Sequence, residues 1–227
     1  MEPVPFAAVL LVAAPVVIAS FLGIIAIAEV GHRRLLVPAE VTRTSAHVGC
    51  AVVAALLPLV LGRWAIVALG AGFAVLMAVS RRHQLLLGLH GVERRTWGEV
   101  AFPLGLVLPE AAGLPAVAYA AGALVLGIGD SAAGVIGRRW GRHGYRSWGG
   151  SKSLEGSIAM WVVTALVASL VLAAYPPTPG RFVVAVVVTA TVCSAVEAAL
   201  GYGLDNLALP LVASLTLVWT SGTISTV

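Results

Sequence analysis

The sequence predicts an all-α membrane protein, a polytopic helix bundle of about eight transmembrane segments, with seven as the alternative count. Of its 227 residues, 59% are hydrophobic and only 11% are charged, and the mean hydropathy is +0.99. A soluble domain carries about 25% charged residues. Apolar stretches that approach the ~20 residues needed to span a bilayer recur along the chain. These observations exclude a water-soluble globule and predict a single integral-membrane domain over residues 1–227.

Eight apolar segments are expected to span or enter the membrane. They cover residues 5–28, 46–62, 64–80, 99–110, 115–137, 154–175, 182–200 and 206–222. The first is longer than a signal-peptide core and has no small-residue cleavage site before its basic cluster, so we expect it to be retained. The fourth is short and contains two prolines, which favours a half-helix or a re-entrant segment. Both cysteines lie within apolar runs and offer neither zinc spacing nor a disulfide framework.

The distribution of basic residues predicts the orientation of the chain. With the N-terminus outside, twelve of the fourteen Lys and Arg residues fall in inside loops, and only Arg63 and Arg181 fall outside. Because cytoplasmic loops carry an excess of Lys and Arg, we expect a multi-pass protein of the cell membrane whose site faces the cytoplasm. The arginines are dispersed over short loops without stacking aromatics, which favours contact with anionic lipid and argues against nucleic acid.

The rarest polar side chains gather at this predicted inside face. The chain has one lysine, Lys152, and two aspartates, Asp130 and Asp205. An ionisable group within a spanning helix is costly and by default indicates function. Asp130, Glu197 and Asp205 come from different helices at similar depth, which suits a hard divalent cation that also holds the phosphates of a nucleotide. The alternatives are an arginine partner for Glu197 and an N-cap role for Asp205.

The segment between the fifth and sixth helices has the groups that a polyanion needs. Gly149-Gly150-Ser151-Lys152-Ser153 leads into a helix and offers backbone N–H groups, two hydroxyls and an ammonium beside a helix N-terminus. It does not match the Walker A pattern, so phosphate binding without a P-loop fold is expected.

Two glycines in the fifth helix, Gly134 and Gly137, favour close helix packing. The basic residues near this segment have two interpretations each. Arg43 and His47, at i,i+4 spacing, are expected either to contact phosphate or to cap the helix and snorkel. The remaining basic residues either bind phosphate or anchor on lipid headgroups; these are Arg138, Arg139, Arg142 and Arg146.

These motifs together resemble the CTP-dependent polyprenol kinase family, which includes dolichol kinase, phytol kinase and the yeast-type CTP-dependent diacylglycerol kinase. The resemblance is carried by Gly129-Asp130-Ser131-Ala132-Ala133, by Lys152-Ser153-Leu154-Glu155-Gly156-Ser157, and by Glu197 with Leu204-Asp205-Asn206-Leu207-Ala208-Leu209-Pro210. Weaker similarity includes Arg43 with His47 and the stretch that begins at Glu99. Thr44 departs from the pattern, since a second basic residue is expected there. Phosphatidate cytidylyltransferases are more distantly similar, but their acidic, histidine-bearing C-terminal signature is absent after Pro210.

The resemblance implies an enzyme that transfers the γ-phosphoryl group of CTP to a prenyl alcohol of the polyprenol, geranylgeraniol or phytol type, with Mg²⁺. It implies catalytic roles for Asp130 and Lys152, and metal binding by Asp130, Glu197 and Asp205. Contacts to the nucleotide are expected from Arg43, His47, Arg138, Arg139, Arg146, Ser151, Lys152, Ser153, Glu155 and Gly156. Glu155 is expected to support Lys152 or to contact the metal, and Asn206 and Glu99 are further site candidates.

Two other functions remain open at this point. One is CDP-lipid synthesis of the phosphatidate cytidylyltransferase type. The other is a non-catalytic transporter or scaffold, although a transporter would place its charged groups near the bilayer midplane within inverted repeats.

Overall fold

The structure of the protein is a computed structural model that describes residues 6–90 and 96–222. Arg94 and Arg95, which belong to the predicted inside loops, lie outside the described residues. The elements are α1 (Phe6–Leu35), α2 (Ala39–Leu56), a 3₁₀ turn (Leu57–Leu59), α3 (Arg63–Arg82), α4 (Leu87–His90), α5 (Gly98–Ala111), α6 (Ala116–Leu124), a π-helical segment (Val125–Asp130), α7 (Ser131–Trp140), β1 (Gly144–Ser147), β2 (Gly150–Ser153), α8 (Leu154–Ala174), α9 (Phe182–Ala199) and α10 (Leu204–Ser221).

The all-α polytopic bundle is confirmed, with seven membrane spans. Among the described residues, seven helices are long and apolar enough to cross a membrane, and α6, the π-helical segment and α7 together form one of them. The fourth predicted segment, residues 99–110, becomes α5, which has only 14 residues and contains Pro103 and Pro109. At 1.5 Å per residue it is ~21 Å long, too short for a hydrocarbon core of ~30 Å. The alternative count of seven is therefore the one that the structure supports.

Two helix ends differ from the prediction. The first helix continues past Glu29 to Leu35, and α2 begins at Ala39, so Arg43 and His47 lie within α2 instead of opening it. A hydropathy pattern ends where polar residues begin, but a helix extends into the headgroup region, where its polar turns are solvated. Arg43 and His47 are consequently held at fixed positions on a regular helix.

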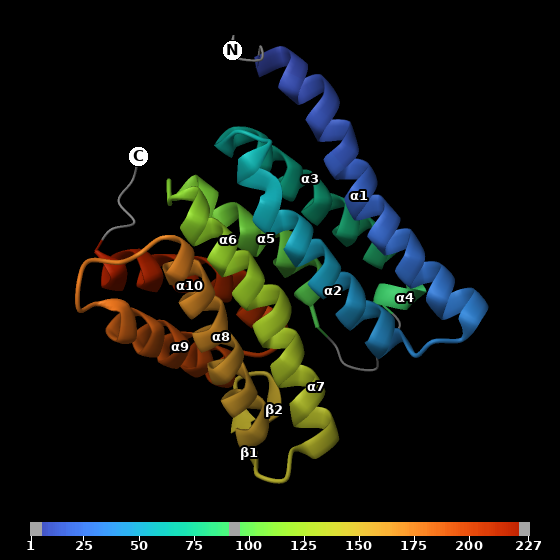
Figure 1. Cartoon of the computed structure of the whole chain (residues 1–227). Coiled ribbons are helices and arrows are strands. Elements are labelled where there is room, and N and C mark those ends of the chain that lie inside the picture. The colour runs from blue at the N-terminus through green and yellow to red at the C-terminus, as the bar shows by residue number, and fades with distance from the viewer. Residues whose placement is uncertain (1–5, 91–95, 223–227) are drawn as a thin grey trace.

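The helices pack on both sides of the long α6–α7 rod. In Figure 1, α1, α2 and α3 lie to one side of this rod and α8, α9 and α10 to the other. Tyr119, Leu126, Met160 and Leu209 are fully buried where these groups meet. The short helix α5 packs between α3 and α10, and Gly105 permits this because a Cβ atom there would collide with the backbone of Asn206.

A small β-hairpin replaces the irregular loop that the sequence predicts between α7 and α8. Strands β1 and β2 pair antiparallel from Gly144 opposite Ser153 to Ser147 opposite Gly150. Gly149 occupies the turn with a φ of 101°, a left-handed conformation that favours glycine. The neighbouring Trp148 N–H donates to the carbonyl of Ala199 at 3.0 Å, which ties the hairpin to the end of α9.

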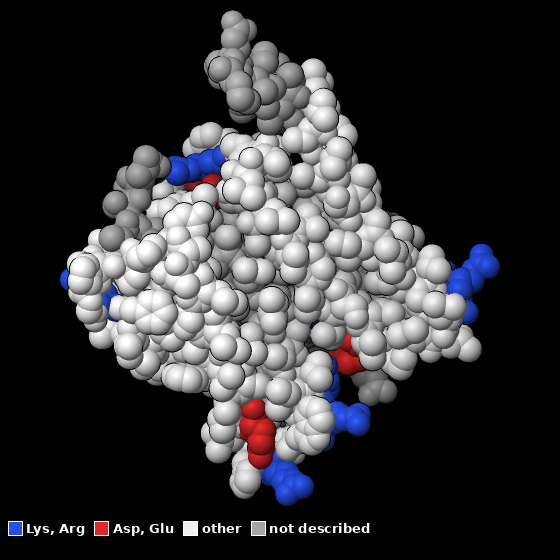
Figure 2. Space-filling model, in the orientation of Figure 1, with Lys and Arg blue, Asp and Glu red and all other residues white. Residues whose placement is uncertain are grey.

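We call the end of the bundle that carries this hairpin the hairpin end. Here the last turns of α1, α3, α7 and α9 meet the first turns of α2, α5, α8 and α10. Most of the face visible in Figure 2 is uncharged, and its charged side chains lie toward the edges. Arg63 and Arg181 start helices at the opposite end of the bundle, so the predicted asymmetry of basic residues holds for the described part of the chain.

Candidate active site

A polar cavity of about 740 Å³ lies at the hairpin end. It is surrounded by α2, α7, both strands of the hairpin, and the ends of α8, α9 and α10. The predicted site residues that line it are Arg43, His47, Asp130, Arg138, Ser151, Lys152, Ser153, Gly156, Glu197, Asp205 and Asn206. Residues separated by up to 163 positions along the sequence thus meet around one space.

Lys152 is the centre of the charged cluster in this cavity. Its Nζ atom lies 2.8 Å from Oε1 of Glu197 and 3.1 Å from Oδ2 of Asp205, and it also donates to the backbone carbonyl of Glu197. Burial disfavours the charged form of this ammonium, but the carboxylates of Asp205 and Glu197 outweigh that cost and hold the pKa of Lys152 above its usual value. The cavity therefore keeps a protonated lysine.

The alternative roles for the two carboxylates do not occur in this structure. Among the residues that the structure describes, Glu197 pairs with Lys152 and with no arginine, and its Oε2 also accepts a hydrogen bond from Ser157 Oγ at 3.4 Å. Asp205 is not the N-cap of α10, because Gly203 takes that position. The Oδ1 atom of Asp205 instead accepts the N–H of Asn206 at 3.0 Å. Both carboxylates are therefore fixed while their other oxygens face Lys152.

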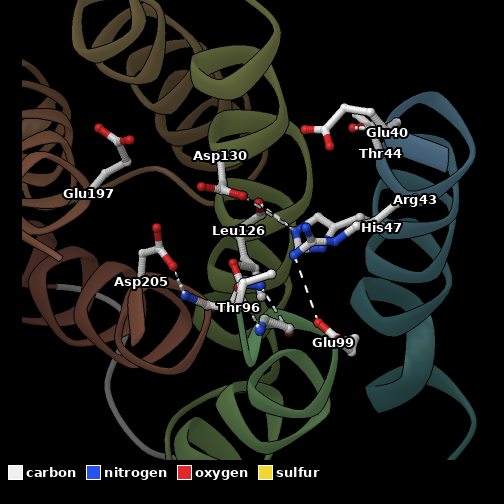
Figure 3. A network of polar contacts seen from close by, with 12 residues as sticks. Glu40, Arg43, Thr44, His47, Thr96, Glu99, Leu126, Asp130, Glu197 and Asp205 are labelled. Carbon is white, nitrogen blue, oxygen red and sulfur yellow. Dashed lines mark hydrogen bonds and ion pairs between the residues drawn. The ribbon is translucent and has the colours of Figure 1, made fainter. Parts of the chain in front are cut away.

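Asp130 stands at the last position of the π-helical segment. This segment packs closely because a Cβ atom at Gly127 would collide with Ala51 of α2, and one at Gly129 would lie 2.9 Å from the sulfur of Met160 in α8. Single π-helical turns inside α-helices occur frequently at functional sites. Figure 3 shows Asp130 among Glu197, Asp205 and His47, each from a different element. The Nε2 atom of His47 lies 4.0 Å from Oδ2 of Asp130.

Glu99 contacts Arg43, one of the residues that line the cavity, and is itself held by two basic side chains. Its Oε1 accepts hydrogen bonds from Arg81 at 2.6 Å and from the Nδ1 atom of His90 at 3.0 Å. Its Oε2 lies 4.0 Å from a guanidinium nitrogen of Arg43, which lines the cavity (Figure 3). Asn206 joins the same region, since its side-chain amide donates to the carbonyl of Gly98 at 3.0 Å and links α10 to α5.

The start of α8 combines capping with close packing. Ser153 is the N-cap, and its Oγ accepts the N–H of Gly156 at 3.2 Å. A Cβ atom at Gly156 would lie 2.8 Å from the carbonyl oxygen of Ala133, and one at Gly137 would lie 3.0 Å from Ser153 Oγ. The close-packing interpretation thus fits Gly137, whereas a Cβ at Gly134 would meet only the side chain of Arg138.

Three predicted nucleotide contacts do not line the cavity. Arg139 and Arg146 are exposed outside it. Glu155 pairs with His143 at 2.7 Å and therefore does not support Lys152, because successive side chains at the strand–helix junction point to different sides. Arg138 does line the cavity, where its guanidinium lies 2.8 Å from Oε1 of Glu40.

Several lining residues carry no signal in the sequence. Glu40, Thr96 and Tyr202 face the cavity from the first turn of α2 and from loops. In a membrane protein, a charged residue stands out in the sequence when it lies within an apolar run. These three residues lie at a helix end or in loops and therefore do not stand out. Tyr202 has a φ of 56°, and such a backbone conformation in a non-glycine residue is apparent only from the structure.

The donor groups of the cavity are suited to Mg²⁺ only when it is shared with a phosphate-bearing ligand. Among the described residues, no three His, Cys, Asp or Glu side chains are grouped so that they could hold a metal ion by themselves. Mg²⁺ is usually bound through one or two protein carboxylates, with water and substrate phosphates completing its shell. Asp130 and Asp205, both on the cavity wall, meet that need.

Comparison with known proteins places the chain among lipid alcohol kinases. No protein-family model matches the chain, and no solved structure matches it. The curated protein "Phytol kinase" from Synechocystis sp. (strain ATCC 27184 / PCC 6803 / Kazusa) is 36% identical over 202 residues, which cover 85% of each chain. At this identity and coverage, the chain belongs to the polyprenol kinase family that includes phytol kinase.

Proposed function

We propose that the protein is a lipid kinase that transfers the γ-phosphoryl group of CTP to a prenyl alcohol at the cytoplasmic face of the cell membrane. The observation that carries the proposal is the polar cavity that Lys152, bound to Glu197 and Asp205, lines together with Asp130. The phytol kinase relative supports a prenyl alcohol as the acceptor. The excess of arginines at the hairpin end supports its cytoplasmic orientation.

The hairpin and the start of α8 would hold the phosphates of the nucleotide. They offer the N-terminal dipole of α8 and the side chains of Ser151 and Lys152. Lys152 has a flexible four-carbon stem, so its ammonium can exchange the carboxylate oxygens of Glu197 and Asp205 for phosphate oxygens. In this proposal Arg43 and Arg138 add positive charge from the facing wall.

Phosphoryl transfer would then need positioning and charge neutralisation more than covalent chemistry. The acceptor oxygen forms a bond to the γ-phosphorus, the bond from that phosphorus to the bridging oxygen breaks, and CDP leaves. Asp130 orients the hydroxyl and takes its proton, with His47 beside it. Asp130 and Asp205 would hold Mg²⁺, which when bound neutralises negative charge on the phosphates.

Asp130→Asn tests this proposal directly. Purified protein given labelled CTP, Mg²⁺ and a panel of prenols should yield the prenyl monophosphate and CDP. Asp130→Asn should abolish this product and leave the melting temperature unchanged, because the amide keeps the size of the side chain but is a poor base. Glu155→Gln is the matched control and should remain active, since Glu155 pairs with His143 away from the cavity.

Each alternative function has its own outcome in the same assay. A CDP-lipid and pyrophosphate formed from phosphatidate and CTP would establish the cytidylyltransferase activity instead. Full activity of Asp130→Asn would overturn the catalytic assignment. Failure of the protein to bind any nucleotide would favour a transporter or scaffold.

A further inference from the structure

A second cavity, lined mainly by apolar side chains, adjoins the polar one. It runs between α1, α2, α3, α5 and α6, and its lining includes Phe21, Ile25, Phe73, Phe102 and Leu106. Arg43 and His47 line both cavities. The two cavities therefore meet at these side chains. The polar cavity lies at the hairpin end, and the apolar cavity lies among the spanning helices.

The apolar cavity is long and narrow. Along α2 it extends from Arg43 to Leu57, fourteen positions or ~21 Å at 1.5 Å per residue. Its volume is only about 100 Å³, so it admits one slender chain. We call this cavity the apolar slot.

The far end of the slot is formed by Leu57, Ile66 and Tyr119, which are 4%, 2% and 0% exposed. Ile66 and Tyr119 each lie one turn from the helix start at the opposite end of the bundle. The slot therefore has a fixed length, because buried side chains block it before the far membrane face.

The other end of the slot contains a carboxylate oxygen that accepts no hydrogen bond from the described residues. The Oε2 atom of Glu99 is buried and makes no hydrogen bond there, although Oε1 of the same carboxylate is bonded to Arg81 and His90. A buried oxygen of this kind is costly unless a donor reaches it. The O–H of an alcohol can donate to this oxygen as it passes Arg43 and His47 on the way to Asp130, whereas an alkane chain offers no donor.

We infer that the apolar slot binds the isoprenoid tail of the acceptor, with its hydroxyl at the end marked by Arg43 and His47. This inference rests on the proposed kinase function and deepens it. Leu57, Ile66 and Tyr119 limit the length of the tail, so diterpenoid alcohols such as phytol and geranylgeraniol are preferred over long polyprenols. Lipid tails are as apolar as the slot, and selection therefore comes from steric fit and not from the hydrophobic effect.

Two leucines on the same 3₁₀ turn provide a matched test. Leu57→Phe adds bulk at the closed end, whereas Leu59→Phe makes the same change at a side chain that is 77% exposed. The measurement is kcat/KM for geranylgeraniol divided by that for the shorter farnesol. One misfitting group in an apolar pocket changes discrimination by about 10–200-fold, so Leu57→Phe should lower this ratio at least about tenfold. Leu59→Phe should keep the wild-type ratio.

A second variant moves the preference in the opposite direction. Ile66→Ala lengthens the slot and should raise the use of longer prenols relative to geranylgeraniol. It also keeps the inference testable if Leu57→Phe does not fold. Wild-type ratios in the folded variants would overturn the assignment of the slot.

A binding readout separates this inference from the proposed function. Geranylgeraniol with a diazirine on its terminal isoprene unit, added without nucleotide, should crosslink to residues at the closed end of the slot, and Leu57→Phe should abolish that crosslink. Crosslinking confined to lipid-facing residues would overturn the inference even if the kinase is active. If the slot is labelled but no nucleotide supports phosphorylation, the proposed function fails and the tail site stands.

Discussion

Lys152 joins the hairpin to α9 and α10 and brings the single lysine of the chain into the polar cavity. Lys152→Met should lower kcat/KM for CTP by at least about 100-fold, because loss of one preorganised charge contact in a transition state costs about 10²–10³ in rate. Lys152→Arg should recover part of the activity, since the charge remains. The measurement is CTP turnover with a fixed prenol.

Arg139→Met is the control for this charge change. Arg139 is exposed and does not line the cavity, so its removal should leave kcat/KM within about twofold, as surface substitutions change little. Equal losses in Lys152→Met and Arg139→Met would show that general surface charge, and not the Lys152 cluster, binds the nucleotide.

The sequence predicts which residues are unusual better than it predicts their contacts. Asp130, Lys152, Glu197 and Asp205 are expected at one site because they are costly in a membrane, and the structure brings all four to one cavity. Glu155 follows Lys152 closely in the same motif, yet it pairs with His143. Proximity in sequence does not fix the direction of a side chain where a strand becomes a helix.

At the level of elements, the contact between α7 and α8 depends on a missing side chain. Gly156→Ala would bring a Cβ atom to 2.8 Å from the carbonyl oxygen of Ala133. Overpacking of this kind costs about 1–3 kcal/mol, so the melting temperature in detergent should fall by several degrees. The nucleotide site should weaken as well, because Gly156 lines the cavity.

Gly72→Ala controls for the general effect of adding a methyl group to a helix. A Cβ atom at Gly72 has nothing within 4 Å, and Ala stabilises a helix interior over Gly by about 0.5–1 kcal/mol. Its melting temperature should therefore stay the same or rise. A similar fall in both variants would contradict the packing role assigned to Gly156.

The hairpin is the element that the sequence does not reveal. Each strand has only four residues, and Gly144, Gly150 and three serines dominate them. Such residues have low strand propensity, so the pairing must come from context. That context includes the bond from Trp148 to Ala199 and the ion pairs of Lys152. A local pattern cannot show either one.

For the whole molecule, the asymmetry of basic residues predicts which end faces the cytoplasm. Arg142→Cys places a thiol at an exposed position beside the hairpin, and Pro179→Cys places one in the exposed loop between α8 and α9. In intact cells, a membrane-impermeant maleimide should label Pro179→Cys and should reach Arg142→Cys only after lysis. The native Cys50 and Cys193 are buried, and labelling of the unmodified protein measures their contribution as background.

The reverse labelling pattern would place the hairpin end outside the cell. CTP is a cytoplasmic nucleotide, so that result would remove the proposed donor from reach of the cavity. The orientation experiment is therefore also a test of the donor.

The spans are largely predictable because membrane crossing depends on the length of apolar runs, a property of each segment alone. The cavities cannot be predicted in this way, because each is lined by side chains from several helices. The apolar slot, for example, is lined by Phe21, Ile66 and Tyr119 from three separate helices. Each of these residues is an ordinary apolar residue in its own segment. Their shared role arises only when the helices pack.

The π-helical segment Val125–Asp130 divides the helical rod Ala116–Trp140 into two parts with different rotational phase. Each residue of an α-helix turns the chain by about 100°. A π-helical turn holds one residue more than an α-helical turn. The residues of α7 therefore face directions that differ by about 100° from those they would have in an uninterrupted α-helix. If the same residues wound as a regular α-helix, the Asp130 carboxylate would point about 100° away from its present direction and no longer face the polar cavity. The direction of the Asp130 carboxylate thus depends on the π-helical segment between α6 and α7.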